Sequence, residues 1–240
     1  MDPRPPGDIL ILTAVELEAS ALARHLELPA HAALPGRAFG RGSLRVAPVG
    51  LRAALLTERW PLLAHGLTRP LVVSAGLCGG LDPALAPGDL VCPELVLGAG
   101  GARYRLEASP HRARVVADAG PVHAGPLVTT RDLAATPADK AALRARTGAA
   151  AVDMESAAIV QAAEAAGWPW LVLRGVSDGA GETLHPELAG LVGVEGRLRL
   201  AGAVALALTR PRAIPRAIGL GRRARRALAA VARALAVLGA

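Results

Sequence analysis

Several short runs of consecutive apolar residues end in polar or glycine residues, and stretches with helical spacing separate these runs. They cover residues 9–13, 70–74, 149–152 and 170–173. Consecutive apolar residues are typical of strands that are buried on both faces. Because parallel sheets covered by helices bury their strands in this way, we predict a single α/β domain. Its central sheet should be mixed, largely parallel and flanked by helices.

The remaining elements follow from periodicity and from turn residues. We expect helices at 15–25, 52–65, 137–146 and 156–166, a hairpin at 39–49, a glycine-rich turn at 76–80 and a strand at 90–92. Ligands collect at the carboxyl ends of strands in open α/β sheets. Polar or glycine-rich segments follow Thr13, Ser74, Val152 and Val176, so we expect the functional site there.

Positive charge is concentrated near the end of the sequence. There are 27 lysine and arginine residues and 20 aspartate and glutamate residues, and ten arginines but no acid follow Glu195. Residues 1–195 therefore carry 17 basic and 20 acidic side chains. A main domain with this balance lacks the basic surface that nucleic-acid binding requires, so we expect no nucleic-acid partner.

Other features of composition exclude further classes. Lys140 is the only lysine, and we interpret the excess of arginine as codon usage rather than function. Cys78 and Cys92 are too few for a disulfide framework, and no Cys/His spacing resembles a zinc site, so we expect neither a metal nor a cofactor. The sequence shows no signal-peptide pattern and no apolar stretch of membrane-spanning length, which predicts a cytoplasmic protein.

Three carboxylates come just after predicted strand ends: Glu18, Glu155 and Asp178. Each acid alone could simply complement the dipole at a helix start. Three of them at the same sheet edge, together with a glycine-rich segment, instead favour a catalytic site.

Four sequence blocks occur in an order that resembles a known superfamily. They cover residues 14–18, 74–81 followed by Pro-Gly-Asp at 87–89, 152–158 (Val-Asp-Met-Glu-Ser-Ala-Ala) and 174–178. The blocks resemble those of the methylthioadenosine/adenosylhomocysteine nucleosidases and the purine nucleoside phosphorylases. The resemblance covers about residues 9–190 and implies the fold of that superfamily.

The resemblance implies a role for each carboxylate. Asp178 would be the general acid that shares a proton with N7 of the departing purine, and burial would favour its protonated form. Glu18 would orient or deprotonate the attacking water. Glu155 would bind the ribose hydroxyls and stabilise the oxocarbenium-like sugar, with Met154 against the same ring.

The same blocks imply further substrate contacts and an assembly. Gly76 and Ser177 are expected to bind substrate, Gly76 by letting the backbone approach without a Cβ. A homodimer is expected because pockets of this family are commonly completed at a subunit interface. The base-contacting loop is expected at residues 129–133.

Two departures from the family pattern bear on the reaction. Leu77 stands where a hydroxyl residue commonly helps to hold phosphate or the nucleophile, which favours water as acceptor. Phosphate binding by Arg45, Arg52 or Arg174 stays open. The last block continues Gly-Ala-Gly before Glu182, so the second acid comes later than usual.

We divide the sequence into a catalytic domain at residues 1–200 and an arginine-rich amphipathic extension at 201–240. From Arg222 to Leu238, helical spacing places leucine and valine on one face and arginine on the other. Such a helix could lie on an anionic membrane surface, or its apolar face could pack on the domain or a second subunit.

The tail also resembles that of the hopanoid-associated phosphorylases. This resemblance implies an N-ribosyl hydrolase that releases adenine from a lipid-linked adenosine, adenosylhopane. Alternatives are a soluble methylthioadenosine, adenosylhomocysteine or futalosine nucleosidase, or a purine nucleoside phosphorylase. From another class, a catalytically silent nucleoside-binding or membrane-surface protein stays open.

Overall fold

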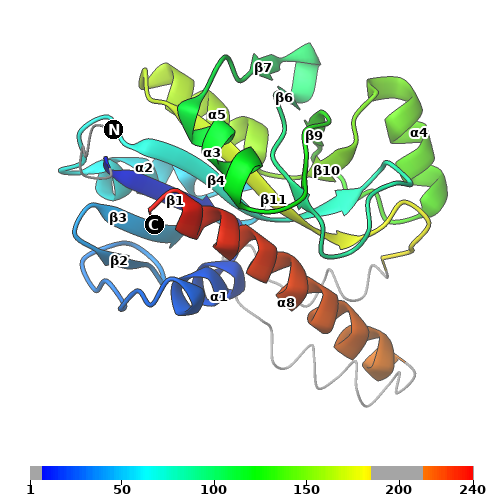
Figure 1. Cartoon of the computed structure of the whole chain (residues 1–240), viewed down its shortest axis with the longest axis horizontal. Coiled ribbons are helices and arrows are strands. Elements are labelled where there is room, and N and C mark those ends of the chain that lie inside the picture. The colour runs from blue at the N-terminus through cyan, green and yellow to red at the C-terminus, as the bar shows by residue number, and fades with distance from the viewer. Residues whose placement is uncertain (1–6, 185–212, 240) are drawn as a thin grey trace.

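A computed structural model describes residues 7–184 and 213–239 (Figure 1). The strands are β1 (Ile9–Thr13), β2 (Phe39–Arg41), β3 (Leu44–Pro48), β4 (Leu71–Gly80), β5 (Leu90–Val91), β6 (Leu95–Leu97), β7 (Arg103–Arg105), β8 (Val122–His123), β9 (Leu127–Thr129), β10 (Ala151–Asp153) and β11 (Trp170–Asp178). The helices are α1 (Glu16–His25), α2 (Leu56–Ala64), α3 (Pro110–Asp118), α4 (Pro137–Thr147), α5 (Ser156–Ala165) and α8 (Ala213–Val237), with short 3₁₀ turns η1 (Leu51–Ala53) and η2 (Ala99–Gly101).

The described strands form one mixed sheet that branches at β4. β4 pairs in parallel with β1 and β11, and its last residues pair antiparallel with β10. The main path runs β2-β3-β1-β4-β10-β9-β6-β7, while β11 continues to β5 and β8. The ends of β1, β10 and β11 therefore meet around one long central strand. The predicted fold class is confirmed.

Helices cover both faces of the sheet. In β1, Ile9 and Ile11 pack with residues of α1, α3 and α8, whereas Leu10 and Leu12 pack with residues of α2 and α5. Alternate strand residues thus enter two separate cores, as expected for a sheet buried on both sides. The continuous apolar sequence of β1 follows from this arrangement.

The helix α8 belongs to one of these cores (Figure 1). Its buried side chains, Leu228, Val231, Leu235 and Leu238, are those that helical spacing places on one face. The backbone of α8 also crosses β11 at close range, because a Cβ on Gly175 would lie 2.4 Å from the carbonyl oxygen of Ala227. Of the two placements that the sequence left open for the apolar face, the structure has the one packed on the domain.

One predicted element differs in the structure, and one predicted boundary falls outside the described residues. The glycine-rich segment at 76–80 was predicted to be a turn, but it is the second half of β4, so this prediction was wrong. The physical reason is that β11 and β10 supply hydrogen-bond partners along both of its edges, which outweighs the low strand preference of glycine. The boundary predicted at residues 200 and 201 lies outside the described residues.

Candidate active site

Glu18, Glu155 and Asp178 line one cleft of about 490 Å³. Glu18 lies in the first turn of α1, Glu155 directly precedes α5, and Asp178 is the last residue of β11. All three side chains are buried. The branching sheet thus brings together three carboxylates that are far apart in the sequence.

Most of the other predicted site residues also line this cleft. Met154 and Ser177 do so, and Leu133 does so from the expected base loop. Gly76 is not among the lining residues. It lies behind the cleft wall, where a Cβ would come within 2.8 Å of Glu18 Oε1 and 2.6 Å of Arg174 Nη1. Its contribution is to leave room for these two side chains.

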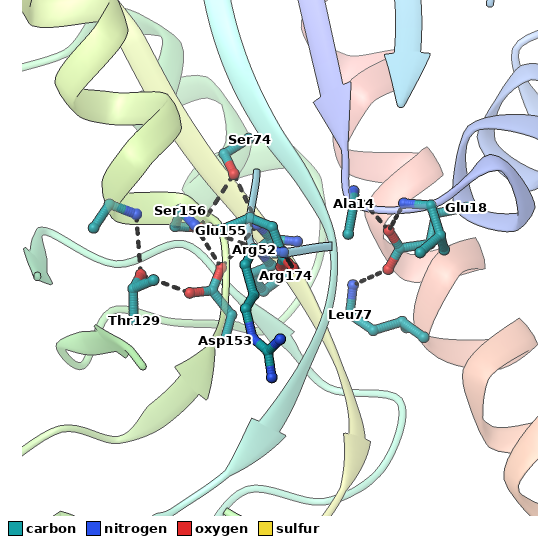
Figure 2. Close-up of polar contacts among 12 residues, drawn as sticks. Ala14, Glu18, Arg52, Ser74, Leu77, Thr129, Asp153, Glu155, Ser156 and Arg174 are labelled. Carbon is teal, nitrogen blue, oxygen red and sulfur yellow. Dashed lines mark hydrogen bonds and ion pairs between the residues drawn. The ribbon is translucent and has the colours of Figure 1, made fainter. Parts of the chain in front are cut away.

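Backbone amides hold the carboxylate of Glu18. Leu77 N–H donates to Oε1 at 2.9 Å, and Ala14 N–H donates to Oε2 at 3.1 Å (Figure 2). Burial raises the pKa of Glu18, and the charge of Arg174 and these amides oppose the rise. A buried carboxylate with a raised pKa is a suitable proton acceptor near neutral pH.

The guanidinium of Arg174 is the central cation of the site. Its Nη2 lies 2.8 Å from Asp153 Oδ2 and donates to the hydroxyls of Ser74 at 2.8 Å and Ser156 at 3.0 Å. Figure 2 shows these groups around one end of the guanidinium. Its Nη1 is buried and has no hydrogen-bond partner among the described residues. This unpartnered donor lies on the side of Gly76 and Glu18.

The backbone of η1 holds the carboxylate of Glu155 in the cleft. The backbone N–H of Arg52 donates to Glu155 Oε1 at 2.9 Å. Arg52 and its neighbour Ala53 have φ angles of 57° and 54°, a left-handed conformation that is costly for residues with a Cβ. The Arg52 side chain donates through Nε to the carbonyl of Arg131 at 2.7 Å, which connects η1 to the expected base loop.

The environment of Glu155 changes its protonation. Burial, together with the negative charge of Asp153, raises the pKa of Glu155 to about 7. Arg174 and the Arg52 amide act in the opposite direction. The Glu155 carboxyl therefore changes charge close to neutral pH.

Asp178 has a cationic partner that the sequence analysis missed. Lys140 of α4 lies with its Nζ 2.5 Å from Asp178 Oδ2, and both side chains are 1% exposed. The Ser177 hydroxyl lies 2.5 Å from Asp178 Oδ1. The sequence did contain an indication of this role, because Lys140 is the only lysine in an arginine-rich chain. The sequence analysis attributed the excess of arginine to codon usage and assigned no role to Lys140.

Several groups that could have bound a phosphate already have other partners. The backbone amide of Leu77 is already used by Glu18, and Arg45 donates to the carbonyls of Leu63 and His65. Arg174 Nη1 is the buried donor with no described partner near the cleft. One such donor beside a carboxylate fits a neutral water better than a phosphate dianion.

Cys78 also lines the cleft. Burial raises the pKa of the Cys78 thiol, which keeps it protonated and unreactive. Within residues 7–184 and 213–239, no group of three or more His, Cys, Asp or Glu side chains is arranged to hold a metal ion. In the same residues, no helix is both long enough and apolar enough to cross a membrane.

Comparison with known proteins places this chain in a family. Residues 8–209 match the profile described as the phosphorylase superfamily. The chain belongs to the phosphorylase superfamily, as its sequence blocks predicted. A futalosine hydrolase of Streptomyces coelicolor is 32% identical over 212 residues, which cover 72% of this chain and 84% of the hydrolase.

Solved structures share the fold at lower identity. The 5′-methylthioadenosine/S-adenosyl homocysteine nucleosidase of Helicobacter pylori aligns with a TM-score of 0.70 and 18% identity, covering 98% of this chain and 99% of the nucleosidase. The futalosine hydrolase of Helicobacter pylori aligns with a TM-score of 0.68 and 17% identity, covering 98% of this chain and 97% of the hydrolase.

Proposed function

We propose that this protein is a nucleosidase that hydrolyses the N-ribosyl bond of a 5′-substituted purine nucleoside with water as acceptor. One observation carries the proposal. Glu18 and the unpartnered Arg174 Nη1 approach β4 at Gly76, Asp178 approaches it at Gly79, and both carboxylates line one cleft. A proton acceptor and a proton donor at different positions along one cleft are what hydrolysis with a poor leaving group requires.

The three carboxylates divide the reaction between them. Glu18 takes a proton from the water that attacks C1′, and Arg174 Nη1 donates a hydrogen bond to that water. Glu155, when ionised, accepts hydrogen bonds from the ribose hydroxyls and stabilises positive charge on the sugar. Asp178 passes a proton to the purine as the N-ribosyl bond breaks.

The names of the relatives supply the first candidate substrates. Futalosine is the substrate named for one relative, and methylthioadenosine and adenosylhomocysteine for the other. Adenosylhopane is the second candidate, because Arg222, Arg226 and Arg233 are exposed along α8 and could approach an anionic membrane. The apolar face of α8 is buried in the domain, so this contact would be electrostatic.

A panel of nucleosides in phosphate-free buffer tests the proposal. We expect free base and free sugar from a 5′-substituted purine nucleoside, measured by chromatography, and no stimulation by phosphate. Strict phosphate dependence with a sugar 1-phosphate as product would overturn hydrolysis. Glu18→Gln should lower turnover by about 10²-fold or more. Glu16→Gln, in the same helical turn but outside the cleft lining, is the matched control.

We also propose that the protein is a homodimer and makes peripheral contact with anionic membranes. Light scattering tests the first, where a monomer would contradict it. Sedimentation with anionic liposomes tests the second, and the binding should weaken as salt rises. Binding that does not depend on salt would contradict an arginine-mediated contact.

A further inference from the structure

The ammonium of Lys140 is fully engaged in the interior. Besides Asp178 Oδ2, Nζ donates to the carbonyl oxygen of Gly179 at 2.7 Å and to that of Glu182 at 3.0 Å. An ammonium has three N–H donors, and each has an acceptor here. Lys140 is therefore fixed against Asp178 by the loop that follows β11.

The charged groups around this pair are occupied elsewhere. Glu182 pairs with Arg223 of α8 at 2.6 Å, and Arg144 of α4 pairs with Asp82 at 2.7 Å. The Cys78 thiol, which lies close enough for the charge of Asp178 to act on it, is held in its protonated form chiefly by burial.

Across the cleft, Glu18 and Glu155 interact electrostatically with Arg174. Within the described part of the chain, Lys140 and Asp178 form an ion pair with each other and with no other side chain.

We propose, building on the nucleosidase function above, that Lys140 and Asp178 together form the acid that protonates the departing base. Lys140 does not line the cleft, so it acts through Asp178 as a positioning residue that also supplies the proton. The pair keeps one proton whether it is ammonium with carboxylate or amine with carboxylic acid. The interior favours the second form more than water does, because separated charges lose their hydration there.

The proton balance of the step is closed. The electron pair of the bond between C1′ and the purine nitrogen moves to the purine as that bond breaks. The proton of Lys140 Nζ moves to Asp178, and Asp178 passes it to the purine, which leaves a neutral amine beside an ionised carboxylate. Water adds its hydroxide to C1′ and gives its proton to Glu18. Solvent then takes the proton from Glu18 and returns one to Lys140 after the products leave.

The first test is the pH profile of Lys140→Met. Without the ammonium, Asp178 can donate only while its own carboxyl is protonated, so activity should be lost progressively as pH rises. We expect the ratio of wild-type to variant turnover to grow at least about 10²-fold between pH 5 and pH 9, the scale of a positioned acid. A lysine that only holds the loop would give a ratio that does not change with pH, which would overturn the proposal.

The variant Lys140→Arg tests whether Lys140 acts through its positive charge alone or also by supplying a proton. Arginine keeps the positive charge but does not give up its proton in proteins. We expect a folded variant with turnover of a purine nucleoside reduced about 10²-fold. Turnover near the wild-type value in this variant would overturn the proposal. Arg144→Gln, which removes an exposed ion pair from the same helix, is the control and should retain activity.

If the Lys140 variants fail to fold, Lys140 can still be observed directly in the wild-type protein. Because Lys140 is the only lysine, protein labelled with ¹⁵N-lysine gives one side-chain nitrogen signal. We expect a buried ammonium signal that moves when adenine is added and that shifts in Asp178→Asn. A side-chain nitrogen signal whose chemical shift does not change at saturating adenine would overturn the role of Lys140. A wild-type protein that releases no base from any nucleoside would instead overturn the proposed function.

Discussion

Glu18 and Asp178 line the same cleft but are buried in different ways. Backbone amides hold Glu18, and the charge of Arg174 acts on it through space. Asp178 contacts the ammonium of Lys140 directly. Burial raises the pKa of Glu18, whereas Asp178 has the N–H of an ammonium within hydrogen-bond distance. In the proposed reaction, this difference suits Glu18 to accept a proton and Asp178 to donate one.

Removing the charge of Asp178 should produce the largest effect. Asp178→Asn is expected to lower turnover by about 10²–10⁴-fold. It also leaves Lys140 buried without an anion, which should lower the free energy of unfolding by about 3–5 kcal/mol. Base release and denaturant unfolding measure the two effects.

Asp82→Asn is the matched control for this stability effect. It removes the carboxylate that pairs with Arg144 of the same helix, and that pair is 40% and 32% exposed. Its cost should be below about 1 kcal/mol. If the two variants have equal free energies of unfolding, the ion pair of Asp178 does not contribute the expected stability.

The raised pKa of Glu155 predicts a dependence of stability on pH. Its ordinary pKa is 4.5, and burial raises the folded-state pKa to about 7. The folded protein then binds this proton more tightly than the unfolded chain, so the stabilisation is complete below pH 4.5 and is lost as pH rises through 7. We expect wild type to lose on the order of 1–3 kcal/mol relative to Glu155→Gln between pH 4.5 and pH 8.

Denaturant unfolding at several pH values checks this. Glu18 has a shift in the same direction, so Glu18→Gln should flatten the same profile in part. Parallel profiles for wild type and Glu155→Gln would contradict the shift.

Two glycines allow a smaller test of the same comparison. A Cβ on Gly76 would lie 2.6 Å from Arg174 Nη1, whereas a Cβ on Gly79 would lie 3.3 Å from Asp178 Oδ2. Gly76 also has a φ of 153°, which L-residues rarely adopt. Gly76→Ala should therefore lower turnover by roughly tenfold, equivalent to about 1.4 kcal/mol. Gly79→Ala should have less effect.

A further glycine isolates the cost of backbone conformation. Gly66 has a φ of 72° and nothing within 4 Å of a Cβ, so Gly66→Ala measures strain without contact. A loss of activity in Gly76→Ala no larger than that in Gly66→Ala would show that the space between Glu18 and Arg174 is not critical.

The sequence predicted the sheet and the convergence of the carboxylates because both depend on local patterns. Apolar runs such as β1 identify buried strands. Acids that come directly after such runs in the sequence were therefore expected at the same edge of the sheet. The length of β4 could not be predicted, because Gly76 to Gly80 form a strand only through pairing with distant segments. Local preference gives no information on such partners.

The charge network was harder to predict than the positions of the acids. The pairing of Arg174 with Asp153 and of Lys140 with Asp178 joins residues on different elements. The spacing of residues in the sequence does not show that α4 lies next to the end of β11. The apolar face of α8 was predicted from periodicity, but its placement against β11 depends on the absence of a side chain at Gly175.

The burial of Lys140 has a practical consequence for titration. Since no other lysine is present, every side-chain cation outside the interior, histidine apart, is a guanidinium. Guanidinium groups stay charged up to about pH 12. The positive charge of these external arginine side chains therefore stays constant over the alkaline range used in enzyme assays. A change in turnover between neutral and alkaline pH does not report a surface lysine, and the interior pair can be followed without that background.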